Sequence, residues 1–357
     1  MVGVVAIFVA LLIPWFMASP PSVVTSGHLL DTGGDQAMSP DGTHLAYDKA
    51  DEKGVYHLYV ASSDGSNPVC ISCDVAPNRN VFSSVWTPDG KLLLVRREDD
   101  SSFFGWLGWN GQGWVSELEE NGVWCDLYAV TPEGKTWTKL LGIDTTAPTD
   151  GLMQVHLSPD GTHVVWSKLT ETAGTNNNPW GTYKIMEADF TQSPPSISNT
   201  RDITPKMPGH FFEAHGFSPD GSKLLFASDS GAAFQWNMNI FSLDLSSGVA
   251  TKLTSGLGWY EHAYYTPSGN RITYMSSDGS YEMYETEVWS MNPDGSDKQQ
   301  VTHFNTPGYA EYAQQVVMAG VPSFSADGTQ MIVGLQLKAS YPQRQMWLLQ
   351  CNGKCIP

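Results

Sequence analysis

One short turn motif, followed each time by an apolar strand, recurs six times along this chain. The six copies begin at Ser39, Thr87, Ser158, Ser218, Thr266 and Ser325 and read SPDG, TPDG, SPDG, SPDG, TPSG and SADG. Proline fixes φ at the first central position of such a turn, and glycine adopts the left-handed conformation that lets the chain reverse. Successive copies are 48 to 71 residues apart. A basic unit of about 48 residues, stretched by insertions in some copies, lies within the range of propeller repeats. The repeat therefore predicts six similar hairpin-based units.

A second pair of strands follows each hairpin. Segments such as HLYVASSDGSNPVCIS (57–72) and NIFSLDLSSGVATKLT (239–254) read as a strand, a polar turn and another strand. A β-sandwich need not repeat in this way, and a parallel sheet would require segments of helical period, which are missing. We therefore predict an all-β fold, a six-bladed β-propeller of four-stranded antiparallel blades over residues 23–357.

The two ends of the repeat array suggest how the ring closes. After Cys355 only Ile356 and Pro357 remain, too few for a full outer strand. Residues 23–30 precede the first hairpin and have no unit of their own. We predict that this N-terminal segment forms or extends the outer strand of the last blade.

The hairpin motif and the D-G-S turns downstream of it resemble the repeat of the TolB-like propeller family, and the resemblance covers all six units. It implies a fold but no single function, because such propellers serve as periplasmic scaffolds, as secreted enzymes and as gating domains of prolyl oligopeptidase-type peptidases. TolB itself would have a separate domain ahead of the propeller, and a hydrolase domain would have a G-x-S-x-G motif. Since neither is found, we expect a bare propeller.

Residues 2–18 are apolar and uncharged, interrupted by Pro14 and followed by Ser19-Pro20-Pro21. We expect residues 1–22 to be an export segment with a linker, either a signal peptide or an uncleaved membrane anchor. A basic residue ahead of the apolar run and a clean cleavage site are both missing, so the two alternatives stay open. In either case we expect the propeller to be secreted or periplasmic.

The five cysteines fit an extracytoplasmic location. Cys70 and Cys73 end the outer strand of the first unit, and Cys351 and Cys355 flank a turn in the last, so each pair can close a local disulfide. Cys125 is left over and is expected to be buried. A four-cysteine zinc site would have to join opposite faces of the disc, which counts against it.

The net charge of −18, with only 19 Lys and Arg residues, argues against nucleic acid and an anionic membrane surface as partners. A protein or a glycan is the partner we expect. Contact with a membrane would occur only through the N-terminal segment, if it is not cleaved.

The long insertions all fall in connections that should lie on one face of the disc. They cover residues 98–122, 143–150, 170–181, 204–211, 276–285 and 303–319. The first of them carries Trp106, Trp109 and Trp114, which either pack over neighbouring blades or stack against a ligand such as a sugar. We expect binding on this loop-rich face.

The inner strands begin at the same face, and their first residues are expected to ring the central channel. This ring comprises Asp35, Gln36, Arg79, Asn80, Gln154, His156, Glu213, His215, Glu261 and His262, with Glu311 and Gln314 on the last connecting loop. A Glu and a His in each of two consecutive units form its most specific chemical signal. The alternative is a structural role, in which the polar side chains bind channel water. His44, His57 and His163 lie on hairpins or outer strands and are expected at the surface.

The ring supplies candidate residues for chemistry. Glu213, His215, Glu261 and His262 are candidate catalytic acids and bases, and His215, His262 and Glu261 are candidate ligands of a divalent cation such as Ca²⁺, Mn²⁺ or Zn²⁺. Asp35, Arg79, Gln154 and His156 are candidate ligand-binding residues.

Two functions remain. The first, narrowly favoured, is a binding scaffold for a protein or glycan, as the TolB-like resemblance implies. The second is a lyase or hydrolase acting on an acidic saccharide, by analogy with propeller polysaccharide lyases that hold a metal through histidine.

Overall fold

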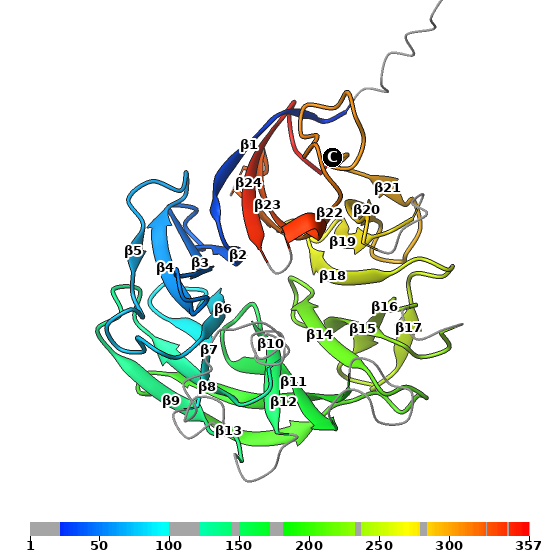
Figure 1. Cartoon of the computed structure of the whole chain (residues 1–357). Coiled ribbons are helices and arrows are strands. Elements are labelled where there is room, and N and C mark those ends of the chain that lie inside the picture. The colour runs from blue at the N-terminus through cyan, green and yellow to red at the C-terminus, as the bar shows by residue number, and fades with distance from the viewer. Residues whose placement is uncertain are drawn as a thin grey trace, which may run out of the picture.

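Six four-stranded antiparallel sheets form a ring around a central axis (Figure 1). The computed structural model describes residues 22–99, 122–144, 150–171, 181–232, 237–278, 284–325, 327–340 and 343–356, apart from the side chains of Ser83, Ser84 and Ser340. In Figure 1 the strands β2, β6, β10, β14, β18 and β22 lie nearest the centre. The predicted fold, an all-β six-bladed propeller, is confirmed.

Each blade is built from strands that are consecutive in the chain, except the last. Blade 1 contains β2 (Gly34–Met38), β3 (His44–Ala50), β4 (Tyr56–Ser62) and β5 (Val69–Cys70), and blade 2 contains β6 (Val81–Trp86), β7 (Leu93–Glu98), β8 (Cys125–Val130) and β9 (Trp137–Leu141). Blade 3 contains β10 (Gly151–Leu157), β11 (His163–Glu171), β12 (Thr182–Gln192) and β13 (Pro195–Asp202), and blade 4 contains β14 (Phe212–Phe217), β15 (Lys223–Ser228), β16 (Asn239–Asp244) and β17 (Ala250–Lys252). Blade 5 contains β18 (Tyr260–Tyr265), β19 (Ile272–Ser276), β20 (Glu287–Met291) and β21 (Gln299–Gln300). Blade 6 contains β22 (Val317–Phe324), β23 (Gln330–Leu337), β24 (Arg344–Cys351) and the N-terminal β1 (Val24–Thr32), and a short 3-10 turn, η1 (Lys338–Ser340), follows β23.

The repeated turn owes its shape to hydrogen bonds inside the motif. In blade 4 the Asp220 carboxylate accepts hydrogen bonds from the Ser218 hydroxyl at 2.6 Å and from the Ser222 backbone N–H at 3.0 Å. The Ser218 hydroxyl oxygen accepts the backbone N–H of Lys223 at 2.9 Å, and Gly221 has φ +72°. The chain thus enters β15 in a fixed direction, and its apolar residues fall into the core. The same bonds recur around Ser39, Ser158 and Ser325.

Replacing Gly221 by Ala is expected to lower the free energy of unfolding by about 1–2 kcal/mol, because an L side chain is strained in the left-handed conformation. The nearest atom to the added Cβ is Pro159 Cδ at 3.8 Å, so the cost comes from the backbone and not from a clash. Gly216→Ala is the matched control, since its Cβ would meet only Tyr264 Cδ1 at 3.5 Å and its φ is ordinary. Denaturant unfolding measures both; equal losses would contradict the turn argument.

The apolar core lies between neighbouring blades. Each of the six blade interfaces has its own cluster of buried residues, each drawn from the two blades that meet there. Between blades 3 and 4, for example, Val165 and Ile185 pack against Phe212 and Phe226. Stability therefore comes from contacts between modules, and a ring with an unpaired edge would expose one of these clusters.

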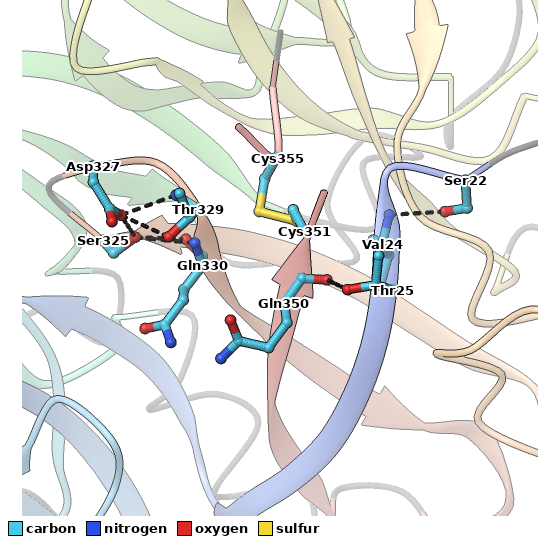
Figure 2. Close-up of a disulfide and its surroundings, with 10 residues drawn as sticks. All are labelled: Ser22, Val24, Thr25, Ser325, Asp327, Thr329, Gln330, Gln350, Cys351 and Cys355. Atoms are coloured by element: carbon cyan, nitrogen blue, oxygen red, sulfur yellow. Dashed lines mark hydrogen bonds between the residues drawn. A yellow bond between two sulfur atoms is a disulfide. The ribbon is translucent and has the colours of Figure 1, made fainter. Parts of the chain in front are cut away.

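The ring is closed by the N-terminal strand, as predicted. Strand β1 pairs antiparallel with β24, from Val24 opposite Cys351 to Thr32 opposite Gln345. The Thr25 hydroxyl donates to the Gln350 carbonyl at 3.1 Å, and the disulfide between Cys351 and Cys355 lies beside this seam (Figure 2). The strand spans residues 24–32, so its limits differ by one or two residues from the predicted 23–30.

Both predicted disulfides are present, Cys70–Cys73 and Cys351–Cys355, and Cys125 is buried as expected. The expectation that His57 lies at the surface is wrong, because this residue is only 4% exposed. Its strand, β4, has neighbours on both sides, and the turn that follows β5 folds back to hydrogen-bond with β4.

Among the residues that the structure describes, no helix is long and apolar enough to cross a membrane. Of the expected export segment, residues 1–22, all but Ser22 lie outside those residues, as do Trp106, Trp109 and Trp114.

Candidate functional site

Every inner strand has an irregular register close to the channel. The shifts lie between Gly34 and Ala37, Phe82 and Ser84, Met153 and His156, Ala214 and Phe217, Glu261 and Tyr264, and Gly320 and Ser323. In three of these bulges a polar residue four positions ahead of the turn motif has positive φ: Asp35 (44°), Gln154 (52°) and His262 (51°). Bulges redirect side chains, and backbone strain of this kind concentrates at functional sites. The bulges thus control which side chains face the channel.

Blades 4 and 5 bring three potential metal ligands together. A carboxylate oxygen of Glu213, one of Glu261 and a ring nitrogen of His262 all lie within 4.8 Å of one another. Glu213 and Glu261 are 4% and 7% exposed. The two glutamates occupy the same position in consecutive units, five residues ahead of the turn motif. Sequence reasoning singled out these three residues, and the structure brings them together; we call them the channel cluster.

Two more histidines and a tyrosine adjoin the channel cluster. His215 is fully buried, and its Nε2 lies 3.8 Å from Oε2 of Glu213. The His215 ring is 5.9 Å from that of His262 and 6.1 Å from that of Tyr264. The Tyr264 ring also lies 5.8 Å from the His156 ring. His215 therefore lies behind the cluster, whereas His156 is only partly buried.

Several polar atoms of this group are buried and have no hydrogen-bond partner. They are Oε2 of Glu213, both ring nitrogens of His215, Nδ1 of His262 and Nε2 of His156. Buried polar atoms in folded proteins nearly always have partners, so a concentration of unsatisfied ones requires an explanation. A bound ion, water or ligand would supply the missing interactions.

Burial shifts the pKa of these groups toward their neutral forms. Burial raises the pKa of Glu261 to about 7, and burial together with the nearby Glu261 carboxylate raises the pKa of Glu213 well above its usual value. Burial lowers the pKa of His156 to about 3 and that of His215 well below its usual range. Burial also lowers the pKa of His262, an effect that Asp35 partly opposes. Near neutral pH, therefore, the histidines are neutral, the form in which an imidazole binds a metal.

Opposite charges surround Asp35, which comes from blade 1. Its carboxylate lies 3.9 Å from Nη2 of Arg96 and 3.6 Å from Nη1 of Arg344, and Arg344 is also 3.6 Å from Asp48. The carboxylates of Asp35 and Glu213 are close enough to raise the pKa of Glu213 further. Sequence reasoning missed both arginines. For Arg96 a signal was available, since it is a charged residue in β7 directly after the apolar run LLLV (92–95).

Of the other residues predicted to line the channel, one joins the site and two have partners elsewhere. Gln154 hydrogen-bonds with Glu213 and so belongs to the site. Arg79 forms an ion pair with Glu98 at 3.1 Å, at the end of the second strand of its blade. The expectation that Glu311 lines the channel is wrong: it packs against Gly27 of the outermost strand β1 and accepts the backbone N–H of His303 at 2.9 Å.

No protein-family model matches this chain. An uncharacterised protein from Agrobacterium fabrum is 33% identical over 217 residues, which are 61% of this chain and 56% of that protein. Dipeptidyl-peptidase 5 from Porphyromonas endodontalis is 23% identical over 301 residues, 76% of this chain and 40% of the peptidase. This chain thus spans only about half the length of these relatives.

Solved structures agree on the fold. TolB from Acinetobacter baumannii superposes with a TM-score of 0.55 and 17% identity, covering 90% of this chain and 65% of TolB. An oligogalacturonate lyase in complex with manganese superposes with a TM-score of 0.52 and 13% identity, covering 91% of this chain and 90% of the lyase. At such identities the likeness establishes the fold alone. The chain is a six-bladed β-propeller with the fold of the TolB-like proteins.

Proposed function

We propose that this protein is an extracytoplasmic propeller that binds a divalent cation in its central channel and uses it to bind and cleave an acidic saccharide. The observation that carries the proposal is the convergence of Glu213, Glu261 and His262, whose ligand atoms lie within 4.8 Å of one another. Two disulfides support an oxidising, extracytoplasmic compartment, secreted or periplasmic. The leader in residues 1–22, cleaved or retained as an anchor, is part of this proposal.

The donor set fits a divalent cation. Two carboxylates and an imidazole suit Mn²⁺ or Zn²⁺, and a cation would compensate the cost of burying two neighbouring carboxylates. When bound, the cation would neutralise a carboxylate of the ligand and so acidify the adjacent C–H group. The Gln154 side chain hydrogen-bonds with the Glu213 carboxylate and holds it in place, and His215 lies 3.8 Å from the same carboxylate.

We assign to His156 the role of accepting a proton from a channel ligand. The residue is partly exposed, its Nε2 is buried without a hydrogen-bond partner, and its lowered pKa keeps the ring neutral at physiological pH. Removal of a proton next to a carboxylate, with departure of the glycosidic oxygen, is the reaction of a lyase. Arg96 and Arg344 pair with Asp35 and Asp48, which offset their charge, so the bound cation would supply the positive charge that an anionic ligand requires.

A lyase with the same fold, an oligogalacturonate lyase with manganese, makes an acidic saccharide a reasonable first substrate class. The binding scaffold, which the sequence narrowly favoured, is the competing function. The three tryptophans expected to bind its ligand lie outside the described residues, and the channel cluster is the observation on which the present proposal rests. A scaffold would bind its protein or glycan without a metal.

Metal analysis of the purified full chain tests the proposal. We expect Mn²⁺ or Zn²⁺ to bind in a 1:1 ratio, and His262→Gln to weaken binding by roughly 100-fold, because one of three ligands is lost. His44→Gln, an exposed histidine on the first hairpin, is the matched control and should bind metal normally. Incubation with uronic-acid oligosaccharides should then yield unsaturated products only with metal present. A parent chain that binds no divalent cation would contradict the proposal and favour the scaffold.

A further inference from the structure

A second cluster of potential metal ligands lies in the outer half of blade 1. A ring nitrogen of His57 on β4 and the sulfur atoms of Cys70 and Cys73 lie within 4.8 Å of one another. In the structure the two sulfurs form a disulfide. We propose that reduction of this disulfide converts Cys70, Cys73 and His57 into a zinc site, so that blade 1 carries a redox-controlled metal site.

His57 has the position and the neighbours of a metal ligand. It is 4% exposed, and its Nδ1 has no hydrogen-bond partner. Its Nε2 lies 3.7 Å from Oδ2 of Asp51, and the other Asp51 oxygen accepts the backbone N–H groups of Lys53 at 2.7 Å and Val55 at 3.0 Å. A fixed carboxylate behind a histidine sets the tautomer with the proton on Nε2. Nδ1 is therefore the nitrogen that can bind a metal together with the two sulfur atoms.

The turn that carries the cysteines is anchored without the disulfide. The Ile71 N–H donates to the Leu58 carbonyl at 2.9 Å, and the Leu58 N–H donates to the Ser72 hydroxyl oxygen at 2.9 Å. Ala76 N–H donates to the Ser72 carbonyl at 2.8 Å. The first two bonds hold Ile71 and Ser72, the middle of the C-I-S-C segment, against β4, and the third ties the following turn to Ser72. Reduction would therefore leave the two thiols beside His57 instead of releasing them.

The surroundings also favour a thiolate. The backbone N–H of Cys73 donates to the Cys70 sulfur at 3.0 Å, an interaction that stabilises negative charge on that sulfur. Both cysteines are partly exposed, so a dithiol reductant can reach them. Thiolate and imidazole ligands are the set that zinc prefers.

A dithiol is the co-reactant that reduces the Cys70–Cys73 disulfide. The dithiol gives two electrons and two protons to the Cys70–Cys73 bond and becomes a disulfide itself, leaving two protein thiols. Zn²⁺ then displaces the two thiol protons into solvent and binds both sulfurs and His57, with water as its fourth ligand.

The other disulfide provides a contrast within the same chain. Cys355 is fully buried in the apolar cluster between blades 5 and 6. Among the described residues, neither Cys351 nor Cys355 belongs to a group of three potential metal ligands. The proposed site is therefore specific to blade 1 and is also independent of the channel cluster.

The test uses the full chain with Cys351→Ser and Cys355→Ser, reduced with dithiothreitol, desalted without oxygen and titrated with Co²⁺. We expect the thiolate-to-cobalt charge-transfer band in the reduced chain, its loss on adding Zn²⁺, and no such band in the oxidised chain. A carboxylate and histidine site in the channel cannot produce this band. His57→Gln should weaken cobalt binding about tenfold or more, whereas His163→Gln, a partly exposed histidine on β11, should not.

Two results would overturn the proposal: a reduced chain with native circular dichroism and no charge-transfer band, or an unchanged band in Cys70→Ser/Cys73→Ser. If His57→Gln fails to fold, the chain with His57 intact gives the answer. Zn²⁺ should slow the alkylation of Cys70 and Cys73 after reduction, as followed by mass spectrometry of their peptide. Equal rates with and without Zn²⁺ would exclude the site.

Discussion

Removal of residues 22–30 is expected to lower the melting temperature by roughly 10–20 °C, because the ring then opens at its seam. Strand β1 contributes a ladder from Val24 to Thr32 against β24 and buries Val24 in the cluster between blades 5 and 6. Backbone hydrogen bonds contribute about 1 kcal/mol each. Losing this ladder therefore costs several kcal/mol, a large part of the 5–15 kcal/mol that typically stabilises a folded protein.

The reference for this deletion is a chain that begins at Ser22 and keeps β1 whole. Calorimetry and limited proteolysis of the two chains measure the difference. A synthetic peptide of residues 22–32 should restore part of the lost stability by adding back to the free edge of β24, as a strand does in β-augmentation. A melting curve that is the same with and without residues 22–30 would rule out a structural role for the seam.

The seam could be predicted from the sequence because it depends on residue types within each turn and on the number of strands in each unit. The turn at Ser218 is held by atoms of its own motif, so its geometry follows from residue types alone. The closure follows from a last unit that lacks one strand and a first segment that has one to spare. Neither the geometry of the turn nor the closure of the ring depends on how side chains pack between the blades.

The bulges of the inner strands could not be predicted, because they depend on packing in three dimensions. Gln154 adopts positive φ although glutamine is not among the residue types enriched there, so nothing in its identity indicates a left-handed conformation. The consequence for the site is large, since a bulge decides which of two neighbouring residues faces the channel. The complete burial of His215 is one such outcome.

The residues of the candidate site could be predicted where they occupy equivalent positions in consecutive repeats, and could not be predicted elsewhere. Glu213 and Glu261 share a position in consecutive repeats, and neighbouring blades bring equivalent positions together. Arg96 and Arg344 come from β7 and from the start of β24, outside the inner strands, so the repeat gives no reason to expect them beside Asp35. Glu311 was wrongly expected at the channel, because its connecting loop reaches outward to strand β1.

Replacing Glu261 by Gln is expected to stabilise the metal-free chain and to abolish its stabilisation by divalent cations. The pKa of Glu261, about 7 in the folded chain against an ordinary value of 4.5, means that folding disfavours the ionised form. A raised carboxyl pKa lowers stability as pH rises from about 4.5 through 7, and by pH 8 the loss is at most about 3 kcal/mol. Gln removes this loss and a metal ligand together.

Denaturant unfolding of parent and variant at pH 5.5 and pH 8, in the presence of a chelator, measures the expected stabilisation of the metal-free chain. The histidines of the site also titrate in this range, but they are common to both chains, so the difference between the two chains reports Glu261. The gain should be larger at pH 8. Glu133→Gln, on an exposed turn, is the matched control and should change neither stability nor cation binding.

The sign of this effect separates the two accounts of the channel cluster. If Glu261 served only to hold the blades together, its replacement would weaken the fold at every pH, and cations would stabilise parent and variant alike. If its carboxylate is kept beside that of Glu213 in order to bind a cation, the metal-free parent carries a cost that only the cation offsets. The variant then gains stability without metal and loses all response to Mn²⁺, a combination that a structural carboxylate cannot produce.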